Sequence, residues 1–201
     1  MSWILERDAL KRQIDGKKGS RTVYLHAGSS GRHSIDMKFV SQQLYIAYDI
    51  VKNQTRWFSP CFGCWYFEFD QHDSRRSGVK AMIVSFMCTY SCRFLEDEKP
   101  WYPRSPDSWS LKDLINVFLR VRATFSMRDI TIVLGRLDQC DEDERSVLLQ
   151  AILEQQNGNE LVFKLLITTT RPEAFLCDLL PPGNIISLDD CPMSLDEYLY
   201  V

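Results

Sequence analysis

Small, polar and basic residues lie between an apolar run and a helical pattern near the N-terminus. The run Thr22 to His26 predicts a buried strand, and apolar residues three and four apart from Met37 onward predict an amphipathic helix. In a glycine-rich turn before a helix, backbone N–H groups can point at an anion, usually a phosphate. We therefore predict a phosphate-binding loop whose contacts come from Gly28, Ser29, Ser30, Gly31, Arg32, His33 and Ser34.

The end of this loop departs from the pattern GxxxxGK followed by Ser or Thr, in which the lysine binds phosphate and the hydroxyl binds Mg²⁺. Here the loop ends in Arg32, His33 and Ser34, so the hydroxyl is kept while the glycine and the lysine are changed. An imidazole is shorter than a lysine and carries no dependable charge at pH 7. Because a charge-assisted hydrogen bond contributes about 1.5–3 kcal/mol, the change should weaken triphosphate binding roughly tenfold or more.

The composition is that of a globular protein with 201 residues, 45% hydrophobic and 25% charged, and a net charge of −3. This charge gives no basis for binding nucleic acid or an anionic membrane. The longest mainly apolar run, Ala81 to Cys92, is too short to span a bilayer, and no secretory signal is visible. Seven scattered cysteines fit reduced thiols, so we expect a cytoplasmic protein.

Strands and helices alternate along the chain, which predicts a three-layer α/β/α domain around a mainly parallel sheet. Ser110 and Asp141 are expected to cap two of the helices. The five expected strands are Thr22 to His26, Trp65 to Asp70, Ile130 to Leu134, Leu161 to Thr168 and Asn184 to Leu188. We expect residues 1–19 to be an N-terminal helical segment, 20–190 the domain, and 191–201 a tail with a possible short helix.

Three segments in this order resemble the NACHT-type P-loop NTPase domain of the STAND class, and most closely its nephrocystin-like N-terminal module of fungal proteins. They are VYLHAGSSGRHSIDMKFV, similar to the Walker A segment, VLGRLDQCDEDER, similar to the Walker B segment, and LLITTTRPE. The third is similar to the family's strand ending in TSRPE. The resemblance spans roughly residues 20–175. It implies a sheet of the ASCE type, with the Walker B and sensor strands beside the Walker A strand.

The resemblance also implies which residues would act, and several are altered. The Walker B aspartate that would hold Mg²⁺ falls on Gly135, which has no oxygen to offer. The second acid is kept as Asp138, while the catalytic glutamate falls on Gln139, whose amide is not basic. Arg171 matches the sensor arginine. Ala27 occupies the position of the first glycine of the family's Walker A motif, and His33 occupies the position of its lysine.

Two hypotheses follow from this pattern. The first is a degenerate NACHT-type domain that does not hydrolyse nucleotide and acts as a binding or scaffolding module, with protein partners and no required cofactor. The alternative is a functional ATPase or GTPase with a rearranged loop. Ser34 and Asp138 would then hold Mg²⁺, and Arg32 or Arg171 the phosphates of ATP or GTP. The resemblance further implies a fragment of a larger signalling-type protein that can oligomerise.

A zinc site is a third interpretation, because Cys61 and Cys64 precede Cys88 and Cys92 at suggestive spacings. A redox function for the first pair would need a helix after it, whereas a strand is expected there. We favour ordinary reduced thiols at these positions.

Overall fold

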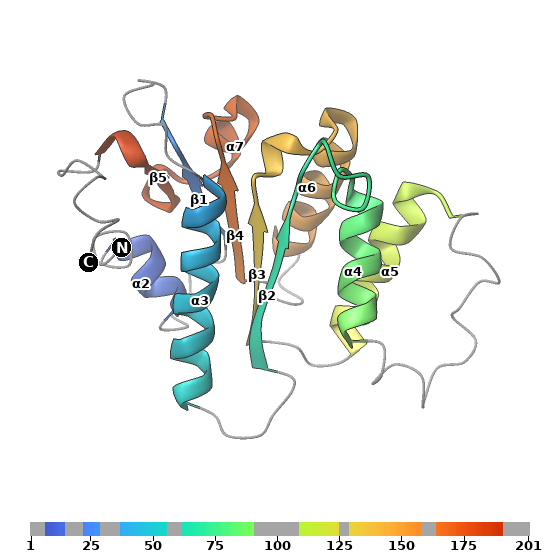
Figure 1. Ribbon diagram of the computed structural model, residues 1–201, viewed down its shortest axis with the longest axis horizontal. Coiled ribbons are helices and arrows are strands. Elements are labelled where there is room, and N and C mark those ends of the chain that lie inside the picture. The colour runs from blue at the N-terminus through green and yellow to red at the C-terminus, as the bar shows by residue number, and fades with distance from the viewer. Residues whose placement is uncertain are drawn as a thin grey trace. The chain divides into compact units, whose positions relative to one another are not determined.

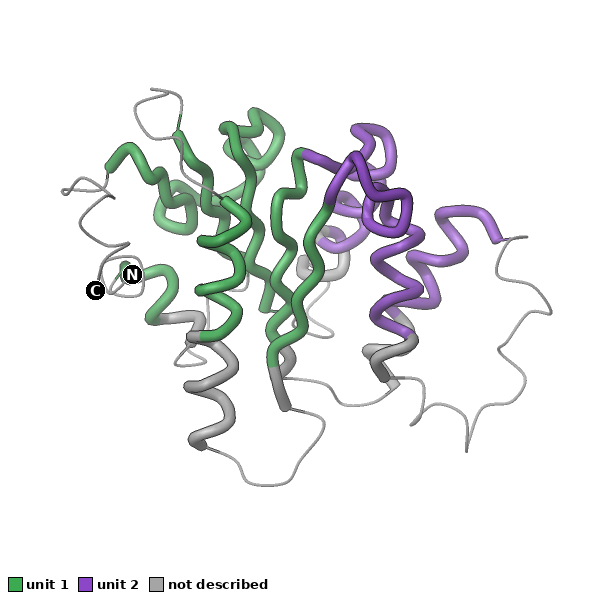
Figure 2. The backbone as a smooth tube through the Cα atoms, in the orientation of Figure 1, with its two compact units in different colours: residues 1–69, 128–138, 162–201 green, residues 70–127, 139–161 purple. Residues whose placement is uncertain are grey.

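The computed structural model describes residues 7–14, 22–28, 37–55, 62–90, 109–124, 129–157 and 164–190. The chain forms two compact units, drawn in green and purple in Figure 2. Unit 1 comprises residues 1–69, 128–138 and 162–201, and unit 2 comprises residues 70–127 and 139–161. None of the helices in the described part of the chain is long and apolar enough to cross a membrane.

Unit 1 contains a five-stranded, all-parallel sheet in the order β2-β3-β4-β1-β5 (Figure 1). The predicted α/β fold is therefore confirmed. Strand β4, predicted to be the sensor strand, pairs directly with β1 as expected. Strand β3, predicted to be the Walker B strand, pairs with β4 and not with β1. The strands are β1 (Thr22–His26), β2 (Phe62–Glu68), β3 (Asp129–Gly135), β4 (Lys164–Thr169) and β5 (Ile185–Ser187).

Every residue of the central strands β1 and β4 is buried. A parallel strand in the middle of a sheet is covered on both faces, which is why such strands read as nearly continuous apolar runs. This pattern made β1 and β3 predictable from their sequences. The predicted start of β2 at Trp65 was wrong, since the strand begins at Phe62 and takes in Cys64.

Helix α3 (Met37–Thr55) packs on β2, β3 and β4. Its buried residues Met37, Val40 and Leu44 recur at helical spacing, as predicted, and join one core cluster with the side chains of the sheet. Helix α2 (Asp8–Ile14) adds Ala9 and Leu10 to the same cluster. The core of unit 1 therefore fixes where the first strand ends and where α3 begins.

Unit 2 consists of helices α4 (Val79–Tyr90), α5 (Leu111–Thr124) and α6 (Glu142–Asn157), which contact one another. The predicted caps are confirmed. The Ser110 hydroxyl accepts the Asp113 N–H at 3.2 Å, and Asp141 accepts the N–H groups of residues 143 and 144 at 3.0 and 3.2 Å. Glu144 in turn accepts the Val79 N–H at 2.7 Å, so a side chain of α6 caps α4.

The buried face of α3 yields a prediction about stability. Leu44 is fully buried, whereas Ile46 on the same helix keeps 44% of its surface exposed. Leu44→Ala should lower the free energy of unfolding by about 2–5 kcal/mol, because it leaves a cavity in the core. The matched change Ile46→Ala should stay within about 0.5 kcal/mol. Urea unfolding followed by circular dichroism measures both, and equal losses would contradict this assignment of the core.

Candidate functional site

The described residues predicted to bind nucleotide lie at the carboxyl ends of β1, β3 and β4, the edge where open α/β sheets bind ligands. Gly28 follows β1, Asp138 and Gln139 lie in the short helix η4 (Leu137–Gln139) after β3, and Arg171 follows β4. Parallel pairing brings these three strand ends to one edge. The remaining predicted contacts lie outside the described residues: Ser29, Ser30, Gly31, Arg32, His33 and Ser34.

Gly135, onto which the sequence resemblance places the metal-binding aspartate, is crowded. A β-carbon added there would lie 3.1 Å from Cε2 and 3.2 Å from the hydroxyl of Tyr66, and 3.2 Å from Cβ of Ser41. These separations are tighter than ordinary van der Waals contacts. Any side chain at this position would therefore require Tyr66 or Ser41 to shift.

The crowding side chains are held in place by other contacts. The Tyr66 ring stacks on Tyr45 at 5.6 Å between centroids, and its hydroxyl donates to Glu68. Glu68 lies opposite Gly135 in the β2–β3 register and is buried. Its other oxygen pairs with the Arg136 guanidinium at 3.5 Å. The buried carboxylate of Glu68 thus lies beside Gly135 in the sheet, but it is already paired with Arg136.

A chain of buried hydroxyl groups links β3, β4 and α3. The backbone N–H of Arg136 donates to the Thr168 hydroxyl at 3.1 Å, and the hydroxyls of Thr168 and Ser41 share a hydrogen bond of 2.6 Å. Ser41 donates to the Met37 carbonyl at 2.6 Å. With Thr168 donating to Ser41, every hydrogen in the chain has an acceptor. Arg136 adopts a positive φ of 53°, a conformation that non-glycine residues rarely adopt.

Asp138 connects the ends of β3 and β4. One carboxylate oxygen accepts the Thr170 N–H at 3.0 Å, and the other accepts the hydroxyl of the same threonine. A carboxylate held by both oxygens acts as a clamp between strand ends, much as an aspartate caps a helix. Because each oxygen keeps a second lone pair, a metal ion would have to share Asp138 with Thr170.

Tyr24 shapes the turn that carries Arg171. Its hydroxyl accepts the Glu173 N–H at 2.8 Å and lies 2.8 Å from the Thr169 hydroxyl, which donates to the Arg171 carbonyl at 2.5 Å. Burial raises the pKa of the Tyr24 phenol to about 12, so it stays protonated at neutral pH. The backbone of Arg171 is fixed while the residue itself is exposed.

An unexpected acid stands where the predicted phosphate-binding loop begins. Gly28 has a positive φ of 97°, and a β-carbon added to it would overlap the carboxylate of Asp189. Asp189 belongs to the short helix η6 (Leu188–Asp190), which follows β5 directly. A carboxylate against the first glycine of such a loop opposes the approach of a phosphate, because like charges repel.

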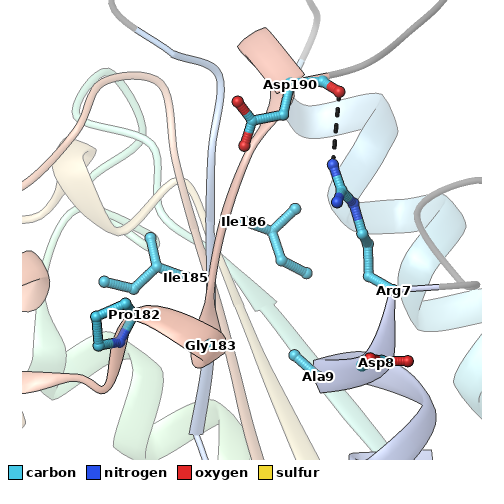
Figure 3. Close-up of a pocket in the computed structure, with 8 residues that line it drawn as sticks. All are labelled: Arg7, Asp8, Ala9, Pro182, Gly183, Ile185, Ile186 and Asp190. Carbon is cyan, nitrogen blue, oxygen red and sulfur yellow. Dashed lines mark hydrogen bonds between the residues drawn. The ribbon is translucent and has the colours of Figure 1, made fainter.

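A cavity of about 470 Å³ lies along β5 rather than at these strand ends (Figure 3). Arg7 at the start of α2 spans one side and donates to the Asp190 carbonyl at 3.5 Å. Neither Gly28, Asp138 nor Arg171 is among its lining residues. We assign it no role in the predicted site.

Sequence reasoning missed the residues that fill this edge, namely Ser41, Tyr66, Glu68, Arg136 and Asp189. One signal was available for Glu68, since it is a lone acid within an aromatic strand, where an unpaired charge would be costly. The contacts of the others depend on which strands are neighbours. Among the described residues, no group of three or more His, Cys, Asp or Glu side chains is placed to hold a metal ion. Cys61 and Cys92 of the zinc interpretation lie outside the described residues.

Comparison with known protein families gives one finding for this chain. A family model described as "Nephrocystin 3, N-terminal" matches residues 1–170, which is most of the sequence. The matched region includes the loop after β1 and the whole of β3, and it ends one residue before Arg171. No curated protein matches the chain.

The hydroxyl chain predicts different outcomes for two fully buried threonines. Thr168→Val leaves the Arg136 N–H without its acceptor and should lower the free energy of unfolding by about 1–3 kcal/mol. Thr131→Val is the control, because the Thr131 hydroxyl is buried and has no hydrogen-bond partner among the described residues. That change should be neutral or stabilising. Urea unfolding compares the two, and equal losses would refute the proposed importance of the chain.

Proposed function

Because the chain belongs to the nephrocystin 3, N-terminal family, we propose that it is a non-hydrolysing NACHT-type P-loop domain that acts as a protein-binding or scaffolding module. The nephrocystin-like resemblance expected from the sequence is confirmed by the family match. The parallel sheet, with its altered loop after β1, is consistent with the P-loop class. Membership of the STAND class and a fungal origin stay predictions.

The observation that carries the proposal is the crowding at Gly135. Magnesium at such a site is bound through one or two carboxylates together with phosphate oxygens. At Gly135 there is no carboxylate, and the β-carbon of any residue that carried one would press against Tyr66 and Ser41. The nearest carboxylate in register, Glu68, is paired with Arg136. These residues do not fit a bound Mg²⁺ ion, so we derive no hydrolytic step through one.

The phosphate side of the site supports the same proposal. Arg32 replaces the glycine of the loop pattern and His33 replaces the lysine, so the usual point charge for the β- and γ-phosphates is missing. The carboxylate of Asp189 against Gly28 adds a negative charge at the start of the loop. Both changes act against a nucleotide triphosphate.

The alternative function, an ATPase or GTPase with a rearranged loop, assigns Mg²⁺ to Ser34 and Asp138 and the phosphates to Arg32 or Arg171. Arg171 is exposed on a turn that Tyr24 and Thr169 hold in place, which suits a phosphate-binding role. Asp138, however, already accepts hydrogen bonds from Thr170 on both of its oxygens and would have to share them with the metal ion. We rank this alternative second for that reason.

A module without hydrolysis would act through its surface, so the proposed partners are proteins, and self-association belongs to the same proposal. The thiols of Cys140 and Cys177 are free, which suits a reducing compartment such as the cytoplasm. Cys140 is buried, and its pKa is raised to about 12 mainly by that burial, so it is not a reactive thiolate.

Titration with fluorescent ATP and GTP analogues, with Mg²⁺ and with EDTA, tests this function. We expect no saturable Mg²⁺-dependent binding at millimolar nucleotide and no phosphate release. Micromolar binding that requires Mg²⁺ would overturn the proposal and favour the alternative. In that case Arg171→Ala and Asp138→Asn should each abolish the Mg²⁺-dependent part.

Restoring one motif at a time separates the two defects. The double change Arg32→Gly with His33→Lys returns the loop to the GK pattern and should raise nucleotide affinity tenfold or more through one charge-assisted contact. That gain should be the same with Mg²⁺ and with EDTA. Gly135→Asp, the matched change on the metal side, should destabilise the fold without adding any Mg²⁺ dependence, because its side chain meets Tyr66 and Ser41. A Mg²⁺-dependent gain in Gly135→Asp would contradict the crowding argument.

A further inference from the structure

His26, the last residue of β1, makes a hydrogen bond that defines its protonation state. Its Nδ1 atom accepts the backbone N–H of Gly28 at 3.1 Å. A ring nitrogen that accepts a hydrogen bond carries no proton, so the ring is neutral and its proton sits on Nε2. The residue is only 8% exposed. Gly28 is thereby held at its positive φ of 97° by a group that can titrate.

Carboxylates near this ring could accept a hydrogen bond from the protonated imidazole. From η6, the carboxylates of Asp189 and Asp190 both act electrostatically on His26, and that of Asp189 lies against the α-carbon of Gly28. From β1, the phenol ring of Tyr24 lies 5.4 Å from the imidazole, centroid to centroid. The flanking strands contribute the uncharged residues Thr169 of β4 and Ser187 of β5, which pair with His26 in register. Every negative charge that faces His26 in the described part of the chain therefore comes from η6.

We propose that His26 is a pH-sensitive latch on the start of the loop after β1. When a proton from solvent adds to Nδ1, that atom changes from acceptor to donor and can no longer bind the Gly28 N–H. The imidazolium then donates to the Asp189 carboxylate instead. Gly28 thereby loses the contact that holds its backbone conformation.

The direction of the pKa shift of His26 means that the latch opens in mildly acidic conditions. Burial lowers the pKa of His26 below its ordinary value of 6.5, against the opposing effect of Asp189 and Asp190. The unfolded chain therefore binds more protons than the folded chain between the lowered pKa and 6.5. Folding stability from this residue is complete above pH 6.5 and is lost as the pH falls through that window. The latch is closed at neutral pH and opens on acidification.

Nitrogen-15 NMR on the full chain tests the latch directly, because the sequence has only three histidines. At neutral pH we expect Nδ1 of His26 to be unprotonated and Nε2 to carry the proton. On acidification the Gly28 amide signal should shift with the same midpoint as the His26 ring, below pH 6.5. A proton on Nδ1 at neutral pH, or a Gly28 amide that ignores the His26 titration, would overturn the proposal.

Two variants and a matched control sharpen the test. His26→Gln supplies an amide oxygen in place of Nδ1 and does not titrate, so the Gly28 amide should lose its pH response. Asp189→Asn removes the charge that favours the imidazolium and should move the midpoint of His26 to lower pH. Asp178→Asn removes an exposed carboxylate of α7 (Ala174–Leu179) and should leave that midpoint unchanged.

An unchanged midpoint in Asp189→Asn would refute the role of that carboxylate even if His26→Gln fails to fold. No nucleotide enters these measurements. The latch and the proposed lack of hydrolysis can therefore fail independently of each other.

Discussion

The backbone of Gly135 is packed so closely against Tyr66 and Ser41 that a β-carbon there would make one of them shift, and the arrangement of the strand ends depends on this approach. The Tyr66 ring is held in this position because its hydroxyl donates a hydrogen bond to Glu68. Glu68 in turn forms an ion pair with Arg136. Breaking a buried ion pair by removing one partner is strongly destabilising, since it leaves an uncompensated charge. The edge of the sheet is therefore a closed polar network in which each group restrains the next.

This network changes how the altered motifs are understood. From the sequence, Gly135 and His33 are independent losses in a nucleotide-binding site. In the structure, Tyr66 and Ser41 lie close to Gly135 and the neighbouring polar groups are hydrogen-bonded to one another. An edge built in this way gains its order from contacts within the chain. That is the behaviour expected of a scaffold whose shape does not depend on bound nucleotide.

The sequence allowed the fold to be predicted because its signals are local. The apolar runs of β1 and β3, the helical spacing of α3, and the caps Ser110 and Asp141 each involve residues close together in the chain. The contacts that define the candidate site are not local. Asp189 reaches Gly28 only because β5 pairs with β1, and Ser41 reaches Thr168 only because α3 packs on β4. The sequence shows that Gly135 has no carboxylate to offer. That Tyr66 lies against Gly135 becomes clear only from the register of β2 and β3.

The central claim, that the carboxyl edge of the sheet has no place for a divalent cation, is tested most directly by paramagnetic NMR. Mn²⁺ can replace Mg²⁺ at oxygen-ligand sites and broadens the signals of nearby nuclei. With Mn²⁺ and ATP added, we predict that the amide signals of Gly135, Arg136 and Thr170 broaden no more than those of exposed residues such as Lys112 on α5. Selective broadening of Gly135 and its neighbours, reversed by excess Mg²⁺, would show a metal site at this edge and contradict the account.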